Sequence, residues 1–242
     1  MARAKSSKTS PQQSTLFESH RWLEQEYAQQ KIHRIIGIDE AGRGPLAGPV
    51  VAAAATLPPD TWIPQLDDSK RLSEAQRDKL FDQVLDKADA VGVAVISAAE
   101  IDEINILQST LKAMRLALVQ LLRQLPEEPQ LILIDGNQKF PFDGPLKTVV
   151  KGDHLSHNIA AASILAKVTR DRIMAAYHDL YPIYDFASHK GYASAKHRQA
   201  ILDHGPCPIH RFSFKGVLPE EKEEPPTEND ESLLTDSTSD GT

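Results

Sequence analysis

The chain has 242 residues, 40% of them hydrophobic, so it can bury the core of one domain of ordinary size. It has no apolar run near the roughly 20 residues of a membrane span, and its N-terminus lacks the apolar stretch of a secretory signal. The single cysteine, Cys207, excludes an internal disulfide framework and is typical of a reducing compartment. We therefore expect a cytoplasmic protein, although the Ser-, Lys- and Arg-rich start also permits a transit peptide.

The net charge of −7 is concentrated at the C-terminus. Residues 219–242 hold nine Asp or Glu and one Lys, a net −8, so the remaining chain carries +1. An acidic segment with few large apolar side chains cannot offset its ordering entropy, so we expect residues 218–242 to form a disordered tail. Before it we expect a polar, flexible N-terminal segment over residues 1–30 and one folded domain over residues 31–217.

The first half of the domain reads as strands with one helix. Apolar runs bounded by glycine or proline predict strands over residues 33–40 and 48–57, joined by a glycine-rich turn. Ser73 with Gln76 forms a capping-box pattern, which predicts a helix to about residue 87 and then a third strand over 90–99.

The second half alternates helices with short strands. Apolar residues three or four positions apart predict one long amphipathic helix over residues 100–125. The later elements are strands over 130–135 and 147–150, a long helix over 156–180 and a final helix over 194–203. Strands that first form a meander and then alternate with helices indicate an α/β fold with a mixed sheet.

Four carboxylates follow the predicted strands. Asp39 and Glu40 end the first strand, Asp135 ends the strand over 130–135, and Asp153 follows the strand over 147–150. An acid beside a glycine after a strand is ordinary turn chemistry, but functional groups also collect at the carboxyl ends of strands in open α/β sheets. Acids that converge repel one another unless a cation neutralises them, and ligand sets of oxygen alone favour Mg²⁺ or Mn²⁺ over zinc. Such a site would activate water and stabilise a transferring phosphoryl group.

A glycine-rich loop follows the first pair of acids. Gly42 and Gly44 let the backbone approach a ligand closely, and Arg43 between them suits a phosphate. A dinucleotide-binding fingerprint fits poorly, because the spacing to Gly48 is wrong and a strand follows where that motif needs a helix. A phosphate-loop nucleotide binder would need a Lys-Ser/Thr pair that the loop lacks.

Seven sequence blocks identify a resemblance. In chain order they read GIDEAGRGPLAGPVVAAA, LDDSKRLS, EIDEINILQSTLKAM, LILIDGN, VVKGD, AAASILAKVTRD and HKGY. Together they resemble bacterial ribonuclease HII, the type 2 ribonuclease H, from about residue 34 to residue 217. The resemblance implies a ribonuclease H-like fold, with a mixed β-sheet flanked by helices and a helical C-terminal part. Arg71, where Lys is frequent in the family, is a small departure outside the acids.

The resemblance also implies an activity and a site. The activity is divalent-metal-dependent hydrolysis of RNA in RNA–DNA hybrids, with incision 5′ of ribonucleotides embedded in duplex DNA to leave 3′-hydroxyl and 5′-phosphate ends. The implied catalytic residues and ligands of Mn²⁺ or Mg²⁺ are Asp39, Glu40, Asp135 and Asp153. The implied substrate contacts are Gly42, Arg43 and Gly44 on the ribose 2′-hydroxyl, Tyr192 on the adjoining deoxyribose, and Lys70 and Ser163 on phosphates. A nucleic-acid-binding module that has lost activity is the alternative, against which the presence of all four acids argues.

Several other polar residues have two interpretations. Phosphate contacts or solvated charges are both open for Lys151, Lys167, Arg170, Arg172, Lys190, Lys196 and Arg198. Asp171 lies inside a predicted helix beside Arg170 and Arg172, which favours a structural ion pair. Cys207 lies at metal-like spacing from two histidines, His204 and His210, but no fourth ligand is evident, so zinc is disfavoured. The remaining candidates, His157, His189 and His197, are expected to be surface or phosphate-facing histidines.

The N-terminal segment contains a possible docking peptide. Residues 13–17, QSTLF, resemble the Gln-x-x-Leu-Phe peptide that binds the bacterial sliding clamp, with Gln13, Leu16 and Phe17 as its contacts. Alternatively, Leu16 and Phe17 pack on the following helix or on the domain. The expected partners are thus RNA–DNA hybrids, ribonucleotide-containing duplex DNA and a sliding clamp, with no membrane and a monomeric protein.

Overall fold

The computed structural model of the protein describes residues 22–59, 61–66 and 72–218. Lys70 and the sequence Gln13 to Phe17, which were singled out from the sequence, lie outside these residues. Within the described part, no helix is both long and apolar enough to cross a membrane.

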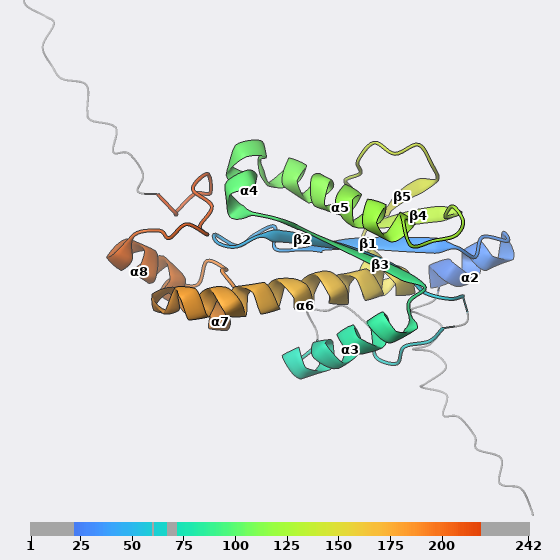
Figure 1. The fold of residues 1–242 in the computed structure, drawn as a ribbon, viewed down its shortest axis with the longest axis horizontal. Helices are drawn as coiled ribbons and strands as arrows, with labels where there is room; N and C mark the ends of the chain where they lie inside the picture. Colours follow the sequence, from blue (N-terminus) through green and yellow to red (C-terminus); the bar gives the residue numbers. More distant parts are fainter. Residues whose placement is uncertain (1–21, 60, 67–71, 219–242) are drawn as a thin grey trace, which may run out of the picture.

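A five-stranded mixed sheet forms the middle layer, with strand order β3-β2-β1-β4-β5 (Figure 1). The strands are β1 (Ile35–Ala41), β2 (Val50–Thr56), β3 (Ala90–Ile96), β4 (Leu131–Asp135) and β5 (Leu146–Val149). β2 is antiparallel to β1 and β3, whereas β4 is parallel to β1 and to β5. The predicted mixed sheet is confirmed, and the carboxyl ends of β1 and β4 meet at one edge of it.

Helices cover both faces of the sheet. α5 (Ile106–Leu122) lies on one face, and α3 (Glu74–Lys87) and α6 (His157–Leu180) lie on the other (Figure 1). Alternate residues of the alanine-rich β2 pack toward opposite faces, as strand geometry requires. Glycine brings α6 very close to β1, because a Cβ on Gly37 would lie 2.1 Å from the main-chain carbon of Asn158.

The long helix predicted over residues 100–125 is wrong in one respect, because the structure divides it. α4 (Ala98–Ile104) ends at Asn105, and α5 begins with the next residue. Asn105 has φ +66°, which no helix permits, and its side chain accepts hydrogen bonds from the amides of Leu107 and Gln108 at the start of α5. The apolar spacing continues through this break, so periodicity alone does not reveal it.

The folded body also begins earlier than residue 31. α2 (Trp22–Gln29) packs Leu23 and Tyr27 against Ile35 of β1 and Leu131 of β4. Residues 22–30, assigned from the sequence to a flexible segment, therefore belong to the packed body.

The C-terminal part is helical, as predicted. After the end of α6 come α7 (Phe186–His189) and α8 (Ala195–His204). They gather at one end of the molecule, while α2 lies at the other end (Figure 1). Residues 207–217 follow α8 and contribute Cys207, Ile209 and Val217 to the core of this C-terminal part.

Candidate active site

The end of β1 presents its two acids to opposite faces of the sheet. Asp39 is buried on the α6 side, where the Ser163 hydroxyl donates a hydrogen bond to it. Glu40 lies on the α5 side and lines a cavity together with Leu107 and Thr110. Successive side chains of a strand alternate between faces, so these two adjacent acids lie on opposite faces of the sheet at the end of β1.

The third and fourth acids reach the same edge through β4 and the turn after β5. Ile38 of β1 pairs with Ile134 of β4 in parallel register, so Asp39 and Asp135 follow at equivalent positions. An oxygen of Asp135 accepts a hydrogen bond of 2.6 Å from the amide of Gly152. Asp153, the next residue, is buried in the short 3₁₀ turn Gly152–His154. The tertiary fold therefore brings all three acidic segments together.

Electrostatics show how close the acids are. Burial, followed by the neighbouring charges of Glu40 and Asp135, raises the pKa of Asp39 well above its usual value. Hydrogen bonds from Ser163 and from the amide of Glu40 act in the opposite direction but are the smaller effects. The folded chain thus makes Asp39 harder to ionise than an exposed carboxyl group.

A divalent cation fits the chemistry of this donor set. The described side chains include no group of three His, Cys, Asp or Glu already arranged as a metal site. The acids nevertheless supply only oxygen donors. Burial, and then repulsion from Glu40 and Asp135, raise the pKa of Asp39, and a cation would relieve that repulsion. Asp39, Glu40 and Asp135, with Asp153 adjoining, are the residues that could hold such an ion.

A cavity of about 110 Å³, which we call the acidic cavity, opens between α5 and the acids Glu40 and Asp135. Glu40 and Asp135 line it together with Arg43, Asn137 and Gln138. Arg43 is the cation in this wall, with its Nη1 3.4 Å from an oxygen of Glu40. Asn137 and Gln138 were not singled out from the sequence as site residues, although Asn137 lies in the block LILIDGN that carries the resemblance.

The glycine loop, which we define as residues 42–49 between β1 and β2, lies next to Tyr192. A Cβ on Gly44 would lie 3.9 Å from Cε1 of Tyr192, and the Tyr192 side chain is 48% exposed. An aromatic face open to solvent beside a bare main chain is suited to packing against a sugar. Of the predicted substrate contacts, the structure therefore brings Gly44 and Tyr192 together, whereas Lys70 lies outside the described residues.

Two arginines beneath the glycine loop were missed or misread. Arg170, one of the candidate phosphate contacts, is only 1% exposed and donates to main-chain carbonyls, so that interpretation is wrong. Arg211 is fully buried and donates to the carbonyls of Gly42, Arg43 and Gly48. The sequence alone does not indicate that the guanidinium group of an arginine will donate hydrogen bonds to the main-chain carbonyls of a loop distant in sequence.

Two further candidates, Asp171 and Ser163, have polar contacts inside the protein. Asp171 pairs with Lys167 at 2.7 Å and with Arg77 at 3.6 Å, so the expected ion pair forms, with other partners. Ser163 is 5% exposed and bonds Asp39, so its expected contact with a phosphate stays a prediction.

The histidines differ from expectation. His157 and His197, expected at the surface, are buried. His210 and Cys207 are also buried and contact each other at 3.2 Å between Nδ1 and Sγ, whereas His204 is exposed. The arrangement of these side chains is therefore one of packing and hydrogen bonding inside the C-terminal part.

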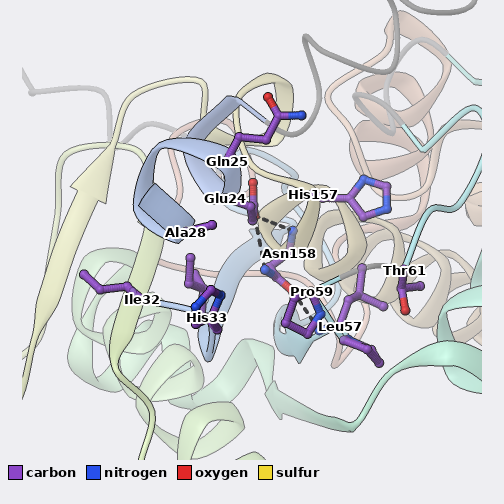
Figure 2. Close-up of a pocket in the computed structure, with 12 residues that line it drawn as sticks. Glu24, Gln25, Ala28, Ile32, His33, Leu57, Pro59, Thr61, His157 and Asn158 are labelled. Carbon is purple, nitrogen blue, oxygen red and sulfur yellow. Dashed lines mark hydrogen bonds between the residues drawn. The ribbon is translucent and has the colours of Figure 1, made fainter. Parts of the chain in front are cut away.

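A second cavity, of about 300 Å³, lies away from the acids (Figure 2). Ile35 at the start of β1, Glu24 of α2 and His157 of α6 line it, and Figure 2 shows Glu24 bonded to Asn158. Asp39 lies further along β1 toward its carboxyl end, so this cavity is not where the acids converge.

Comparison with known proteins agrees with this geometry. A family model described as Ribonuclease HII matches residues 36–217. Ribonuclease HII from Syntrophotalea carbinolica is 52% identical over 196 residues, covering 81% of this chain and 92% of that protein. Ribonuclease HII from Geotalea uraniireducens is 55% identical over 183 residues, covering 76% and 83%.

A solved structure is similar as well. The crystal structure of ribonuclease H2 from Pyrococcus horikoshii OT3 matches with a TM-score of 0.62 and 29% identity, covering 76% of this chain and 94% of that one. The family model and the relatives each cover most of the chain, and residues 36–217 of the family match include the three segments that carry the acids. The chain therefore belongs to the ribonuclease HII family and is an endoribonuclease of the ribonuclease H type.

Proposed function

We propose that the protein incises duplex DNA on the 5′ side of embedded ribonucleotides, as well as RNA in RNA–DNA hybrids, and leaves 3′-hydroxyl and 5′-phosphate ends. Asp39, Glu40, Asp135 and Asp153 are the proposed catalytic residues. The observation that carries the proposal is the convergence of the first three: burial, and then the charges of Glu40 and Asp135, raise the pKa of Asp39.

The acids prepare this site for phosphodiester hydrolysis. Bound among them, Mg²⁺ or Mn²⁺ would polarise the scissile phosphate and lower the pKa of the attacking water. Burial of Asp39 and Asp153 limits the solvent that competes for their oxygens. The amide of Gly152 and the hydroxyl of Ser163 each bond one of the acids and restrict its orientation.

The neighbouring loop supplies the sugar specificity. Only the 2′-hydroxyl distinguishes RNA from DNA at a single position, and main-chain groups near Gly42 and Gly44 can reach it without an intervening side chain. Tyr192 would pack against the next deoxyribose. Arg43, beside Glu40 in the acidic cavity, would meet the phosphate between the two sugars.

The test uses a duplex with one ribonucleotide, incubated with and without Mg²⁺. We expect cleavage only with the metal, and none of an all-DNA duplex of the same sequence. Asp135→Asn should lose at least about 100-fold in kcat, since charge stabilisation worth several kcal/mol is removed. It should keep the fold, because the amide oxygen still accepts from Gly152. Near-normal turnover by Asp135→Asn in saturating Mg²⁺ would disprove the assignment of the site.

Such an activity would serve the removal of ribonucleotides that replication leaves in DNA. We further propose that Gln13, Leu16 and Phe17 tether the enzyme to the sliding clamp, which would raise its effective concentration at new DNA. The support for this tether is the match of residues 13–17 to a clamp-binding pattern.

Titration of a peptide spanning residues 8–22 into the organism's own clamp tests the tether. Short peptides that order on binding have modest affinity, so we expect a Kd of about 1–100 µM. The matched control is the same peptide with Leu16→Ala and Phe17→Ala, which should not bind. Equal binding of both peptides, or binding of neither, would contradict the tether.

A further inference from the structure

One short C-terminal segment is connected through hydrogen bonds to both elements that are proposed to contact the sugars, the glycine loop and Tyr192. Residues 207–211 run alongside the glycine loop: the amide of Gly48 donates to the carbonyl of Ile209, and the amide of Arg211 donates to the carbonyl of Leu46, each at 2.8 Å. Two consecutive side chains of this segment connect it to different elements: His210 connects it to Tyr192, and Arg211 connects it to the glycine loop.

Arg211 leads to the glycine loop. Its Nη2 donates to the carbonyl of Gly42 at 2.6 Å, its Nη1 to that of Arg43 at 3.0 Å and its Nε to that of Gly48 at 3.0 Å. Burial, and then the charge of Arg170, lowers the pKa of Arg211 to about 9, so the group is still charged at neutral pH. A buried guanidinium costs desolvation energy, which here is offset by bonds that fix three carbonyls of one loop.

His210 leads to Tyr192 through a second histidine. Its Nε2 lies 3.1 Å from Nε2 of His197, whose Nδ1 lies 2.9 Å from the carbonyl oxygen of Tyr192. Both imidazoles are fully buried. Two residues on different elements thus join the C-terminal segment to the main chain of Tyr192.

The carbonyl of Tyr192, at the end of this series of hydrogen bonds, determines which ring nitrogens carry the protons. A carbonyl can only accept, so Nδ1 of His197 must donate, and Nε2 of neutral His197 must accept from Nε2 of His210. Nδ1 of His210 is then an acceptor, which matches the 2.9 Å bond it receives from the amide of Cys207. Burial lowers the pKa of His197 to about 4 and also lowers that of His210, which keeps both imidazoles neutral near pH 7.

Arg170 connects the two elements directly. Its Nε and Nη2 donate to the carbonyls of Pro49 and Ala47 in the glycine loop, and its Nη1 donates to the carbonyl of Lys190, two residues before Tyr192. Its guanidinium carbon also lies 5.9 Å from the centre of the Tyr192 ring. We call the four side chains Arg170, His197, His210 and Arg211 the loop brace.

We propose that the loop brace holds the glycine loop and Tyr192 at one fixed separation, and that this separation sets the preference for a single embedded ribonucleotide over a run of ribonucleotides. The inference rests on the proposed roles of the glycine loop and Tyr192. In it, His210 and His197 are positioning residues for Tyr192, since neither side chain is exposed to substrate.

The experiment compares kcat/KM on matched duplexes that contain one or four ribonucleotides. His210→Leu removes the donor to His197. We expect kcat/KM to fall about 10-fold on the duplex with one ribonucleotide but less than about 3-fold on the duplex with four. A loss of this size is expected when a binding group is slightly misplaced. His210→Gln, whose terminal amide can replace the Nε2 donor, should restore the ratio. The exposed His204→Gln is the matched control and should match the wild type.

A double-mutant cycle separates this inference from the proposed function. If His210 acts through Tyr192, His210→Leu should cost nothing further on the single ribonucleotide in a Tyr192→Ala background. Should Tyr192→Ala affect both substrates equally, the proposed role of Tyr192 fails, whatever the brace does. Equal losses on both substrates for His210→Leu, or full additivity with Tyr192→Ala, would overturn the brace.

A second variant covers the possibility that His210→Leu does not fold. His210→Asn carries a shorter amide that reaches only the side of Cys207, so the bond to His197 is lost while a polar group remains. Melting temperatures and circular dichroism of each variant establish folding before the kinetics are compared. We expect His210→Asn to shift the substrate ratio in the same direction as His210→Leu, and an unchanged ratio would contradict the proposal.

Discussion

Asp39 is buried beside Glu40 and Asp135, and both its burial and these charges raise its pKa. A group that is harder to ionise in the folded state than in the unfolded state destabilises the fold at neutral pH. Stability and the proposed catalytic role therefore make opposite demands on this residue, as is common where acids are gathered for chemistry.

We predict that Asp39→Asn unfolds at a higher temperature than the wild type when no metal is present. The amide removes the buried charge yet keeps an oxygen that can accept from Ser163 and from the amide of Glu40. We expect a rise of several degrees in Tm, since about 1 kcal/mol shifts Tm by roughly 2–4 °C in a domain of this size. Activity should be lost at the same time.

Differential scanning calorimetry with and without Mg²⁺ checks this prediction. The metal should raise the Tm of the wild type and leave that of Asp39→Asn nearly unchanged. Asp143→Asn, an exposed change in a loop, is the control and should alter neither Tm nor activity. A lower Tm for Asp39→Asn without metal would show that repulsion among the acids is not a significant cost.

At the scale of elements, the break between α4 and α5 connects local strain with the site. Asn105 has φ +66° and ψ 163°, a region that is adopted almost only by glycine. The break sets the direction in which α5 starts, and Leu107, Thr110 and Leu111 in its first turns line the acidic cavity. The cap and the strain of Asn105 therefore act on one wall of that cavity.

We predict opposite effects for two small replacements of Asn105. Asn105→Ala loses the cap and keeps the strained backbone, so it should destabilise the protein by about 1–2 kcal/mol. Asn105→Gly also loses the cap but relieves the strain, so its free energy of unfolding should equal or exceed that of the wild type. Urea denaturation of the three proteins measures the differences, and equal destabilisation by Ala and Gly would argue against strain at Asn105.

At the scale of the whole molecule, charge is divided unevenly between the body and the last residues. Residues 219–242 carry a net −8, while the rest of the chain carries +1. Because the substrate is a polyanion, this division affects binding without touching the site.

We predict that removing residues 219–242 leaves kcat unchanged and tightens duplex binding about 3- to 10-fold at low salt. The effect should fade above about 0.3 M salt, where screening limits electrostatics to a few ångströms. Fluorescence anisotropy of a labelled duplex across a salt series measures it. A full-length control with the nine acids changed to Asn or Gln should bind like the truncated protein, and weaker binding by the truncated protein at every salt concentration would contradict the prediction.

Local sequence signals were sufficient for most of the elements and for the choice of acids. The strands around Ile38 and Ile134 are buried apolar runs with clear ends, and the cap at Ser73 has the predicted geometry. Asp39, Glu40 and Asp135 could be chosen because each follows such a run directly. The amphipathic spacing also located α5, although it did not show the break at Asn105.

The sequence by itself determined the α/β class, the mixed sheet and the family resemblance, and it supplied the choice of four candidate acids, because each depends on residues close together in the chain or on distinctive short blocks. Only the tertiary structure decided that α2 joins the body, that Asp39 and Glu40 face opposite sides of the sheet, and that Arg170 and Arg211 bind main-chain carbonyls. It also decided that His197 and His210 are buried in a hydrogen-bonded chain to Tyr192. For Arg211 the physical reason is distance along the chain, because its partner Gly42 is 169 residues away and no local pattern contains both. For His197 and His210, whose hydrogen-bond partners lie within 13 residues, the reason is burial, which depends on how the C-terminal part packs.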